Sequence, residues 1–169
     1  TMKWRRAHPP KAEKIRDERI NKSERRKAIR SAIAATLNKS VVSLRGHIPG
    51  ENYPFLISSD FESLKKTKEV KESLLKLGLD KELDRCSVKK VRAGRGKMRN
   101  RKHRRKVGPL FVVSSTCSLC KSARNIPGVE VVNVKSLNAA YLAPGLNPGR
   151  LTLWTEEALD VLEKEKLFN

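Results

Sequence analysis

The sequence predicts an α/β fold, in which a mostly parallel sheet is flanked by helices and carries extended basic arms. Short apolar runs alternate along the chain with amphipathic helical patterns, which is typical of a parallel sheet. The excess positive charge is confined to residues 1–30, with a net charge of +8, and residues 85–106, with a net charge of +12. We therefore expect a basic arm over 1–20 and one globular domain over 21–169 that contains a basic segment at 85–106.

The N-terminal half begins as an irregular arm, because Pro9 and Pro10 prevent regular helical hydrogen bonding. A weak helical pattern covers 12–20. A stronger one covers 22–37, where Asn21 and Glu24 have the spacing of a capping box. Apolar residues recur along that helix at helical spacing: Ala28, Ile29, Ala32, Ile33, Ala35 and Leu37.

The elements that follow alternate between strands and helices. We expect strands over 55–58, 110–114, 129–134 and 151–154, each a short apolar run. Helices are expected over 63–77, ended by Gly78, and over 80–83 and 136–142. A last helix over 156–167 is expected to be capped by Thr155. Residues 91–109 are expected to form a flexible, extended cationic strand that ends at Pro109.

The net charge of +20, from 38 Lys and Arg against 18 Asp and Glu, indicates a polyanionic partner. Nucleic acid is the commonest one. A membrane surface fits less well, since an interfacial helix needs an apolar stripe and the segment 92–106 has only Met98, with Val107 beside it. No run of eighteen apolar residues is present, which argues against a transmembrane helix.

The candidate RNA contacts lie in the two basic segments and on the helix over 22–37. Trp4 and the arginines beside it are suited to stacking on bases. The arginines of the helix could equally be a solvated face. The glycines of the second segment allow the main chain to approach phosphates closely. The full set is Lys3, Trp4, Arg5, Arg6, His8, Arg25, Arg26, Arg30, Arg92, Gly94, Arg95, Gly96, Lys97, Met98, Arg99, Asn100, Arg101, Lys102, His103, Arg104, Arg105 and Lys106.

No catalytic constellation can be identified, so we expect neither an enzyme nor a small-molecule substrate, and no cofactor. The Gly94–Lys97 stretch is not a phosphate loop of the Walker type, because Met98 stands where Ser or Thr is required. Cys117 and Cys120 form a CxxC pattern after a strand, which leaves thiol redox chemistry open as an alternative. A zinc site would need further ligands, for which Cys86 and His103 are the candidates in kind; we expect no metal. An odd number of cysteines fits a reducing cytosol.

Several long motifs resemble the uL4 family of large-subunit ribosomal proteins, in its archaeal and eukaryotic form. These motifs are RAGRGKMRNRKHRRKVGPL (92–110), RNIPGVEVVNV (124–134), LAPG (142–145) and GRLTLWTEEAL (149–159). WRRAH (4–8) and RRKAIRSAIAAT (25–36) are similar to the segment in which the family's long internal loop returns to the body, and LKKTKEV (64–70) matches more loosely.

The resemblance implies a structural, non-catalytic protein of the cytoplasmic ribosome that binds large-subunit rRNA, takes part in assembly and lies near the nascent-peptide exit tunnel. Its implied partners are that rRNA and other large-subunit proteins. Residues 4–8 would belong to the returning limb of the tunnel loop, and 92–106 to a second rRNA-binding stretch. The family also has an N-terminal strand region and an outgoing loop limb, which we expect to be missing before Thr1. An RNA-binding regulator acting away from the ribosome needs the same cationic surface and remains an alternative.

Overall fold

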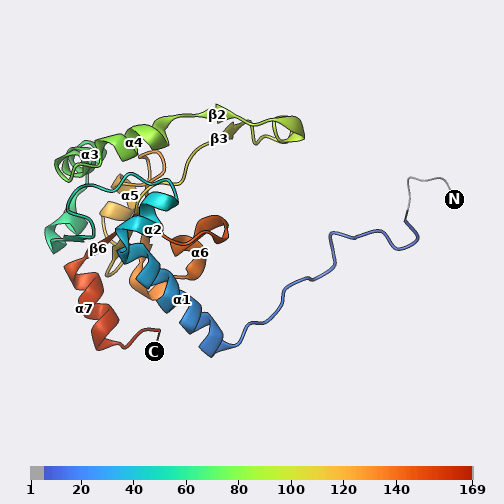
Figure 1. The fold of residues 1–169 in the computed structure, drawn as a ribbon, viewed down its shortest axis with the longest axis horizontal. Coiled ribbons are helices and arrows are strands. Elements are labelled where there is room, and N and C mark those ends of the chain that lie inside the picture. Colours follow the sequence, from blue (N-terminus) through green and yellow to red (C-terminus); the bar gives the residue numbers. More distant parts are fainter. Residues whose placement is uncertain (1–5, 169) are drawn as a thin grey trace.

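The computed structural model describes residues 6–168, and its centre is a four-stranded parallel sheet (Figure 1). The strands follow the order β1-β6-β4-β5, and all three pairings are parallel. The prediction of a mostly parallel α/β sheet is therefore confirmed. The strands are β1 (Phe55–Ile57), β4 (Leu110–Val113), β5 (Glu130–Asn133) and β6 (Thr152–Thr155).

Side chains alternate between the two faces of the sheet, and each face has its own core. In β4, Phe111 and Val113 join one core while Leu110 and Val112 join the other. All four residues of β4 are fully buried, because it is an inner strand covered on both sides. This explains why β4 is a continuous apolar run rather than an alternating one.

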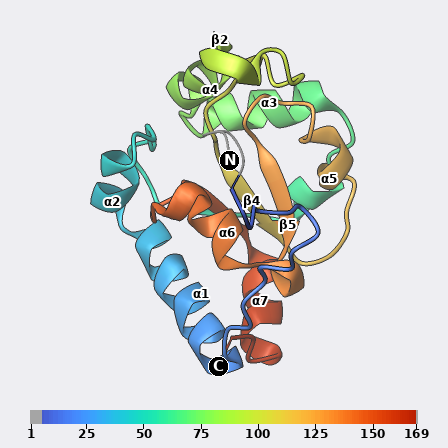
Figure 2. The same cartoon turned by 90° about the vertical axis from the view of Figure 1, so that its right-hand side faces the viewer.

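Helices cover both faces of the sheet (Figures 1 and 2). The core containing Phe111 is closed by α2 (Lys39–Leu44), η1 (Ser59–Ser63), α3 (Thr67–Lys76), α4 (Asp80–Ser87) and α5 (Leu119–Ser122). The core containing Leu110 is closed by α1 (Lys22–Leu37), η3 (Val134–Ser136), α6 (Ala139–Leu142) and α7 (Glu156–Lys164). The short η4 (Pro144–Leu146) follows α6. No helix within residues 6–168 is long and apolar enough to cross a membrane.

The helix predicted over 12–20 is wrong, because the chain there is extended. Its two large apolar side chains, Ile15 and Ile20, are 85% and 68% exposed, so the segment packs against nothing. A helix this short is marginal in water without tertiary contacts. The strong helix is confirmed as α1, and the Asn21 side chain caps it by accepting a hydrogen bond from the Ser23 amide at 3.4 Å.

Three other helix predictions need correction at their N-terminal ends. The helix expected over 136–142 begins only at Ala139, after the separate turn η3. The helix expected over 63–77 begins only at Thr67, after the separate turn η1. Thr155 does precede α7, yet its side chain does not cap the helix. The Thr155 hydroxyl instead donates to the buried Glu62 carboxylate at 2.6 Å, because that acceptor lies next to it at the end of β6.

The segment 91–109, expected to be a flexible extended strand, instead folds back as an antiparallel hairpin that projects from the body (Figure 1). Strand β2 (Lys90–Val91) pairs with β3 (His103–Arg104), and the turn η2 (Gly94–Gly96) lies between them. The Arg92 amide also donates to the Lys102 carbonyl at 2.8 Å. These strands are short, polar and exposed on both faces, so no alternating pattern marks them in the sequence.

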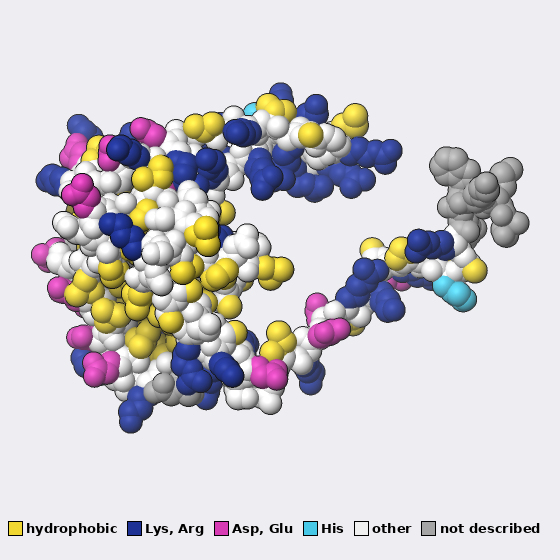
Figure 3. All heavy atoms as spheres, viewed as in Figure 1, with side chains coloured by type: hydrophobic (Ala, Val, Ile, Leu, Met, Phe, Trp, Pro, Cys, Tyr) yellow, Lys and Arg dark blue, Asp and Glu magenta, His cyan; other side chains and the backbone are white. Residues whose placement is uncertain are grey.

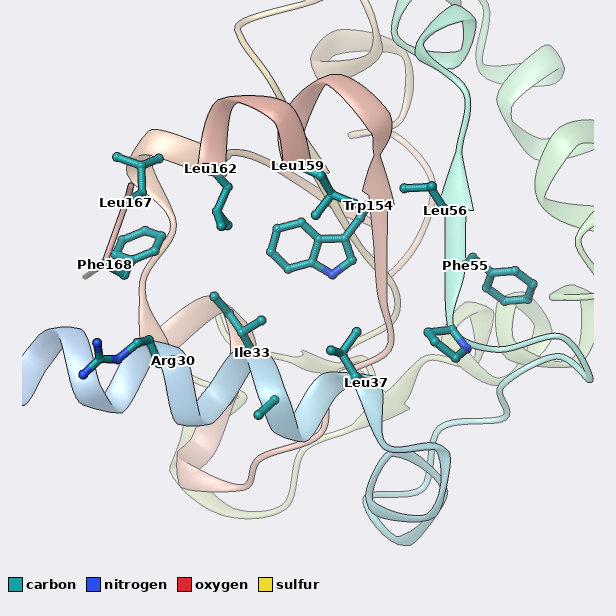
Figure 4. Close-up of a pocket in the computed structure, with 12 residues that line it drawn as sticks. Arg30, Ile33, Leu37, Phe55, Leu56, Trp154, Leu159, Leu162, Leu167 and Phe168 are labelled. Carbon is teal, nitrogen blue, oxygen red and sulfur yellow. The ribbon is translucent and has the colours of Figure 1, made fainter. Parts of the chain in front are cut away.

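An apolar groove of about 560 Å³ lies beside β1, between α1 and α7 (Figure 4). The indole of Trp154 is 5% exposed, and its Nε1 has no hydrogen-bond partner. Within residues 6–168, Arg30 is the only charged residue that lines this groove. The other lining residues are Ile33, Ala34, Leu37, Pro54, Phe55, Leu56, Trp154, Leu159, Leu162, Leu167 and Phe168.

Candidate nucleic-acid interface

The β2–β3 hairpin carries the densest positive charge of the described residues (Figure 3). Between Arg92 and Lys106 it has nine Lys and Arg residues and no acid. Every residue from Arg92 to Lys106 is exposed except Gly96, which is half-buried. The structure thus brings the predicted contacts of this segment together on one projecting element: Arg92, Gly94, Arg95, Gly96, Lys97, Met98, Arg99, Asn100, Arg101, Lys102, His103, Arg104, Arg105 and Lys106.

The turn of the hairpin is shaped by two residues in the left-handed region. Gly94 has φ +72°, where a glycine is not strained, and Asn100 has φ 56°, which asparagine tolerates better than most residues. The Arg101 amide donates to the Gly96 carbonyl at 3.0 Å, which closes the turn. The backbone is therefore folded on itself, and the cationic side chains point into solvent.

A buried charge network anchors the base of the hairpin. The Arg85 guanidinium forms two hydrogen bonds to the fully buried Glu82 carboxylate, at 2.6 and 2.7 Å, and also donates to the Val107 carbonyl at 2.7 Å. The Ile48 amide donates to the same carboxylate at 3.0 Å. Arg85 precedes the hairpin and Val107 follows it, so this network joins both ends of the projecting element to helix α4.

His47 completes the network as a neutral donor. Its Nδ1 lies 2.7 Å from Glu82 Oε1, and burial lowers the pKa of the imidazole despite the opposing effect of that carboxylate. Burial alone would raise the pKa of Glu82, but hydrogen bonds from His47, Arg85 and the Ile48 amide hold it below its ordinary value. Glu82 is therefore ionised and paired with Arg85, and His47 hydrogen-bonds to it without a charge of its own.

A groove of about 760 Å³ runs along the base of the hairpin, facing the loop that follows α6. The wall of this groove opposite the hairpin, formed by Arg45 and the 144–147 loop, was not predicted from the sequence. Arg45 and the 144–147 loop lie about a hundred residues apart in the chain, and the Arg45 guanidinium joins them by donating to the Pro144 carbonyl at 2.6 Å. The signal available in the sequence was the glycine-rich LAPGLNPG stretch, which predicted only a loop. The lining residues are Arg45, Gly46, His47, Arg85, Val88, Lys90, Arg92, Arg104, Arg105, Lys106, Val107, Pro144, Gly145 and Asn147.

The remaining predicted contacts that the structure describes lie on the N-terminal arm and on α1. Lys3, Trp4 and Arg5 fall outside the described residues. Arg6 and His8 are exposed on the extended arm, which projects from the same side of the body as the hairpin (Figures 1 and 2). The arginines of α1 are exposed but do not form a single surface. Arg25 and Arg26 line a hollow together with residues 135–138, whereas Arg30 borders the apolar groove.

The cysteines do not form the site that a redox enzyme needs. Cys117 and Cys120 are half-buried, with their sulfurs 3.9 Å apart. Cys117 precedes the single turn α5, and Cys120 lies within it. Burial, reinforced by the neighbouring Cys120, raises the pKa of Cys117 to about 11, whereas a reactive thiol needs a lowered pKa. Among residues 6–168, no third Cys, His, Asp or Glu joins them to form a metal site, so the zinc alternative with Cys86 and His103 does not assemble.

The carboxyl edge of the sheet, where ligands bind in many α/β folds, is occupied by its own side chains. Glu62 accepts hydrogen bonds from the Ser114 amide at 3.1 Å, the Ser114 hydroxyl at 2.9 Å and the Thr155 hydroxyl at 2.6 Å. Ser114 follows β4 and Thr155 ends β6, so the buried carboxylate ties two strand ends together. Its hydrogen bonds explain Glu62 as a structural residue.

Comparisons with known proteins agree with the motifs and the fold. The Ribosomal protein L4/L1 family matches the chain over residues 3–165. The large ribosomal subunit protein uL4 of Methanococcus aeolicus is 49% identical over 163 residues, which is 95% of this chain and 65% of that protein. Those of Methanocaldococcus jannaschii and Nanoarchaeum equitans are 50% and 49% identical, covering 95% and 99% of this chain. The chain spans 62–65% of the length of these relatives.

Proposed function

Because this chain belongs to the Ribosomal protein L4/L1 family, we propose that it is a structural, non-catalytic component of the large ribosomal subunit. In this proposal it binds large-subunit rRNA through its basic extensions, contributes to subunit assembly and forms part of the exit-tunnel region. It acts in the cytoplasm, on the ribosome, with rRNA and other large-subunit proteins as partners.

The observation that carries the proposal is the hairpin. Nine exposed cations on one projecting element, with no acid among them, repel one another in the free protein. A polyanion removes that repulsion and releases its own condensed counterions, which is the main source of affinity in phosphate-backbone binding. The hairpin therefore favours an RNA-bound state over the free protein.

The extended arm supports a role in assembly. Residues 6–20 pack against nothing in the structure, and most of their side chains are polar or charged. Such a segment gains a defined position only when a partner surrounds it, and the ordering cost is offset by counterion release. An arm of this kind fits between rRNA helices as they pack, together with a hairpin that projects from the same side of the body.

The proposal is tested by crosslinking the purified chain to total cellular RNA with ultraviolet light and sequencing the attached fragments. We expect strong enrichment of large-subunit rRNA over messenger and small-subunit rRNA, with crosslinked peptides from the arm and from 92–106. Enrichment of one messenger RNA without rRNA would instead support a regulator acting away from the ribosome. Equal recovery of all RNA classes would contradict a specific ribosomal role.

A further inference from the structure

We propose that the groove between the base of the hairpin and the 144–147 loop binds a length of RNA sugar-phosphate backbone. This inference rests on the proposed function and adds to it a defined seat on the body. The RNA would enter the groove beside Arg45 and Lys106 and continue along the hairpin toward its tip, so that the body and the hairpin hold one continuous strand.

The charges of the groove call for an anion. Seven of its lining residues are Lys or Arg, and none is Asp or Glu. The nearest structural carboxylate, Glu82, is fully buried and already occupied by Arg85, His47 and the Ile48 amide. Glu82 therefore neutralises Arg85, whereas the other six cations of the groove have no carboxylate among the lining residues. Burial, followed by repulsion from Arg150 and Arg85, lowers the pKa of Arg45.

The pairing of β2 with β3 also favours an anion in the groove. Lys90 and Arg104 stand directly opposite each other in the antiparallel ladder, and both line the groove. Like charges at opposed positions destabilise a strand pair. A phosphate placed between the two side chains would turn this repulsion into two favourable contacts.

The shape of the groove lets a backbone approach closely. Gly46 and Gly145 both line the groove, with φ +93° and +75°, and a Cβ at either would meet nothing within 4 Å. Both glycines thus border open space rather than packed protein. Glycines at such positions allow the main chain and a phosphate backbone to come into contact.

The walls are fixed before any ligand arrives. Arg45 holds the 144–147 loop through the Pro144 carbonyl, and Arg85 holds the end of the hairpin through the Val107 carbonyl. The side chains of Lys90, Arg105 and Lys106 are exposed and line the groove, so these cations are available to a ligand. Fixed walls with available charges reduce the ordering cost of binding.

A polymer fits the groove better than a free anion. Arg92 and Arg104 belong both to the groove and to the hairpin, so the cationic surface continues beyond the groove without a break. A single phosphate could satisfy only two or three of the cations. A strand of RNA can neutralise the groove and the hairpin together.

The test uses fluorescence anisotropy with labelled fragments that tile large-subunit rRNA, taking the fragment that binds the unaltered chain most tightly. The groove variant is Lys90→Gln with Arg105→Gln. Its matched control, which loses the same charge, is Lys71→Gln with Lys121→Gln, exposed positions on α3 and α5. Two phosphate contacts contribute about 1.4–1.8 to the slope of log affinity against log salt concentration. We therefore expect the groove variant to bind roughly 25- to 60-fold more weakly than the unaltered chain at 0.1 M salt. Equal binding by the groove variant and the control would overturn the inference.

A second variant probes the shape without changing the charge. Gly145→Asn places a side chain in the groove while keeping a residue type that tolerates the left-handed conformation. We expect weaker binding with an unchanged salt slope, and unaltered affinity would overturn the close backbone approach. Failure of every rRNA fragment to bind the unaltered chain would count against the proposed function itself, whereas loss of the groove effect alone would leave that function standing.

Discussion

The salt dependence of RNA binding should depend on the hairpin in a calculable way. Four arginines of the hairpin have exposed side chains that face solvent: Arg99, Arg101, Arg104 and Arg105. Replacing all four with Ala therefore removes four potential phosphate contacts without breaking the fold. The buried anchors of the hairpin, Arg85 and Glu82, are left in place.

The magnitude follows from counterion release. Each lost contact flattens the plot of log affinity against log salt by about 0.7–0.9, so four contacts change the slope by about 3. Between 50 and 200 mM salt, such a change corresponds to roughly 60-fold less loss of affinity for the variant than for the unaltered chain. The variant should also bind more weakly at every salt concentration in this range.

The assay is anisotropy of a labelled large-subunit rRNA fragment, titrated at several salt concentrations. The matched control replaces Lys65, Lys71, Lys76 and Lys121 with Ala, which removes the same charge from exposed positions outside the hairpin. We expect the control to keep most of the original slope. A slope unchanged in the hairpin variant, or changed equally in the control, would refute the reasoning that the hairpin contacts phosphates.

Four further predictions concern the fold and the side chains around the interface. Gly108→Ala should lower the free energy of unfolding by about 1–3 kcal/mol, measured by urea denaturation. The reason is that the new Cβ would lie 2.8 Å from Cys86 Sγ and 2.9 Å from the Gly128 carbonyl oxygen. An unchanged denaturation midpoint would contradict this steric conflict. Arg150→Met should cost about 3 kcal/mol in the same measurement, because the buried guanidinium donates to the Gly108 and Tyr141 carbonyls, which would lose their partner; a stable variant would contradict that role. The free energy of unfolding should fall as the pH drops below 6.5, because the pKa of His47 is lower in the folded chain and the unfolded chain therefore takes up the proton first. It should fall further below pH 4.5, because the pKa of Glu82 is also lower in the folded chain. His47→Asn should flatten the plot of unfolding free energy against pH in its upper range. Cys117→Ser should leave RNA binding unaltered. Because the pKa of Cys117 is raised to about 11, the rate of its alkylation by iodoacetamide should increase with pH up to about 11. A rate that is already maximal at pH 7 would restore the redox alternative.

Much of the fold could be predicted from local patterns. The strand β4 is a run of apolar residues, and α1 has both its cap and its buried stripe in the sequence, so periodicity and capping located them. The extended arm over 12–20 was mispredicted because its helical spacing has no surface to pack against. Thr155 was assigned as a cap because the distant Glu62 that takes its hydroxyl cannot be seen locally.

The candidate interface divides in the same way. The charge of 92–106 is visible in the sequence, so the predicted contacts of the hairpin could be named. The groove could not be predicted, since Arg45 and Pro144 meet only through the tertiary fold. The hairpin itself was missed because its two short strands have no buried apolar face, and its base is anchored by the contact of Arg85 with the Val107 carbonyl, which forms only in the folded chain.

The most direct test of a role in the large subunit is sedimentation. A tagged copy of the chain is expressed in archaeal cells, and the extract is run through a sucrose gradient beside the variant that lacks Arg99, Arg101, Arg104 and Arg105. We expect the unaltered chain to travel with large subunits or their precursors, and the variant to shift toward the top of the gradient. The account would be contradicted if the unaltered chain stayed at the top of the gradient. In that case its soluble fraction would have to be folded and to bind rRNA fragments no better than the variant does.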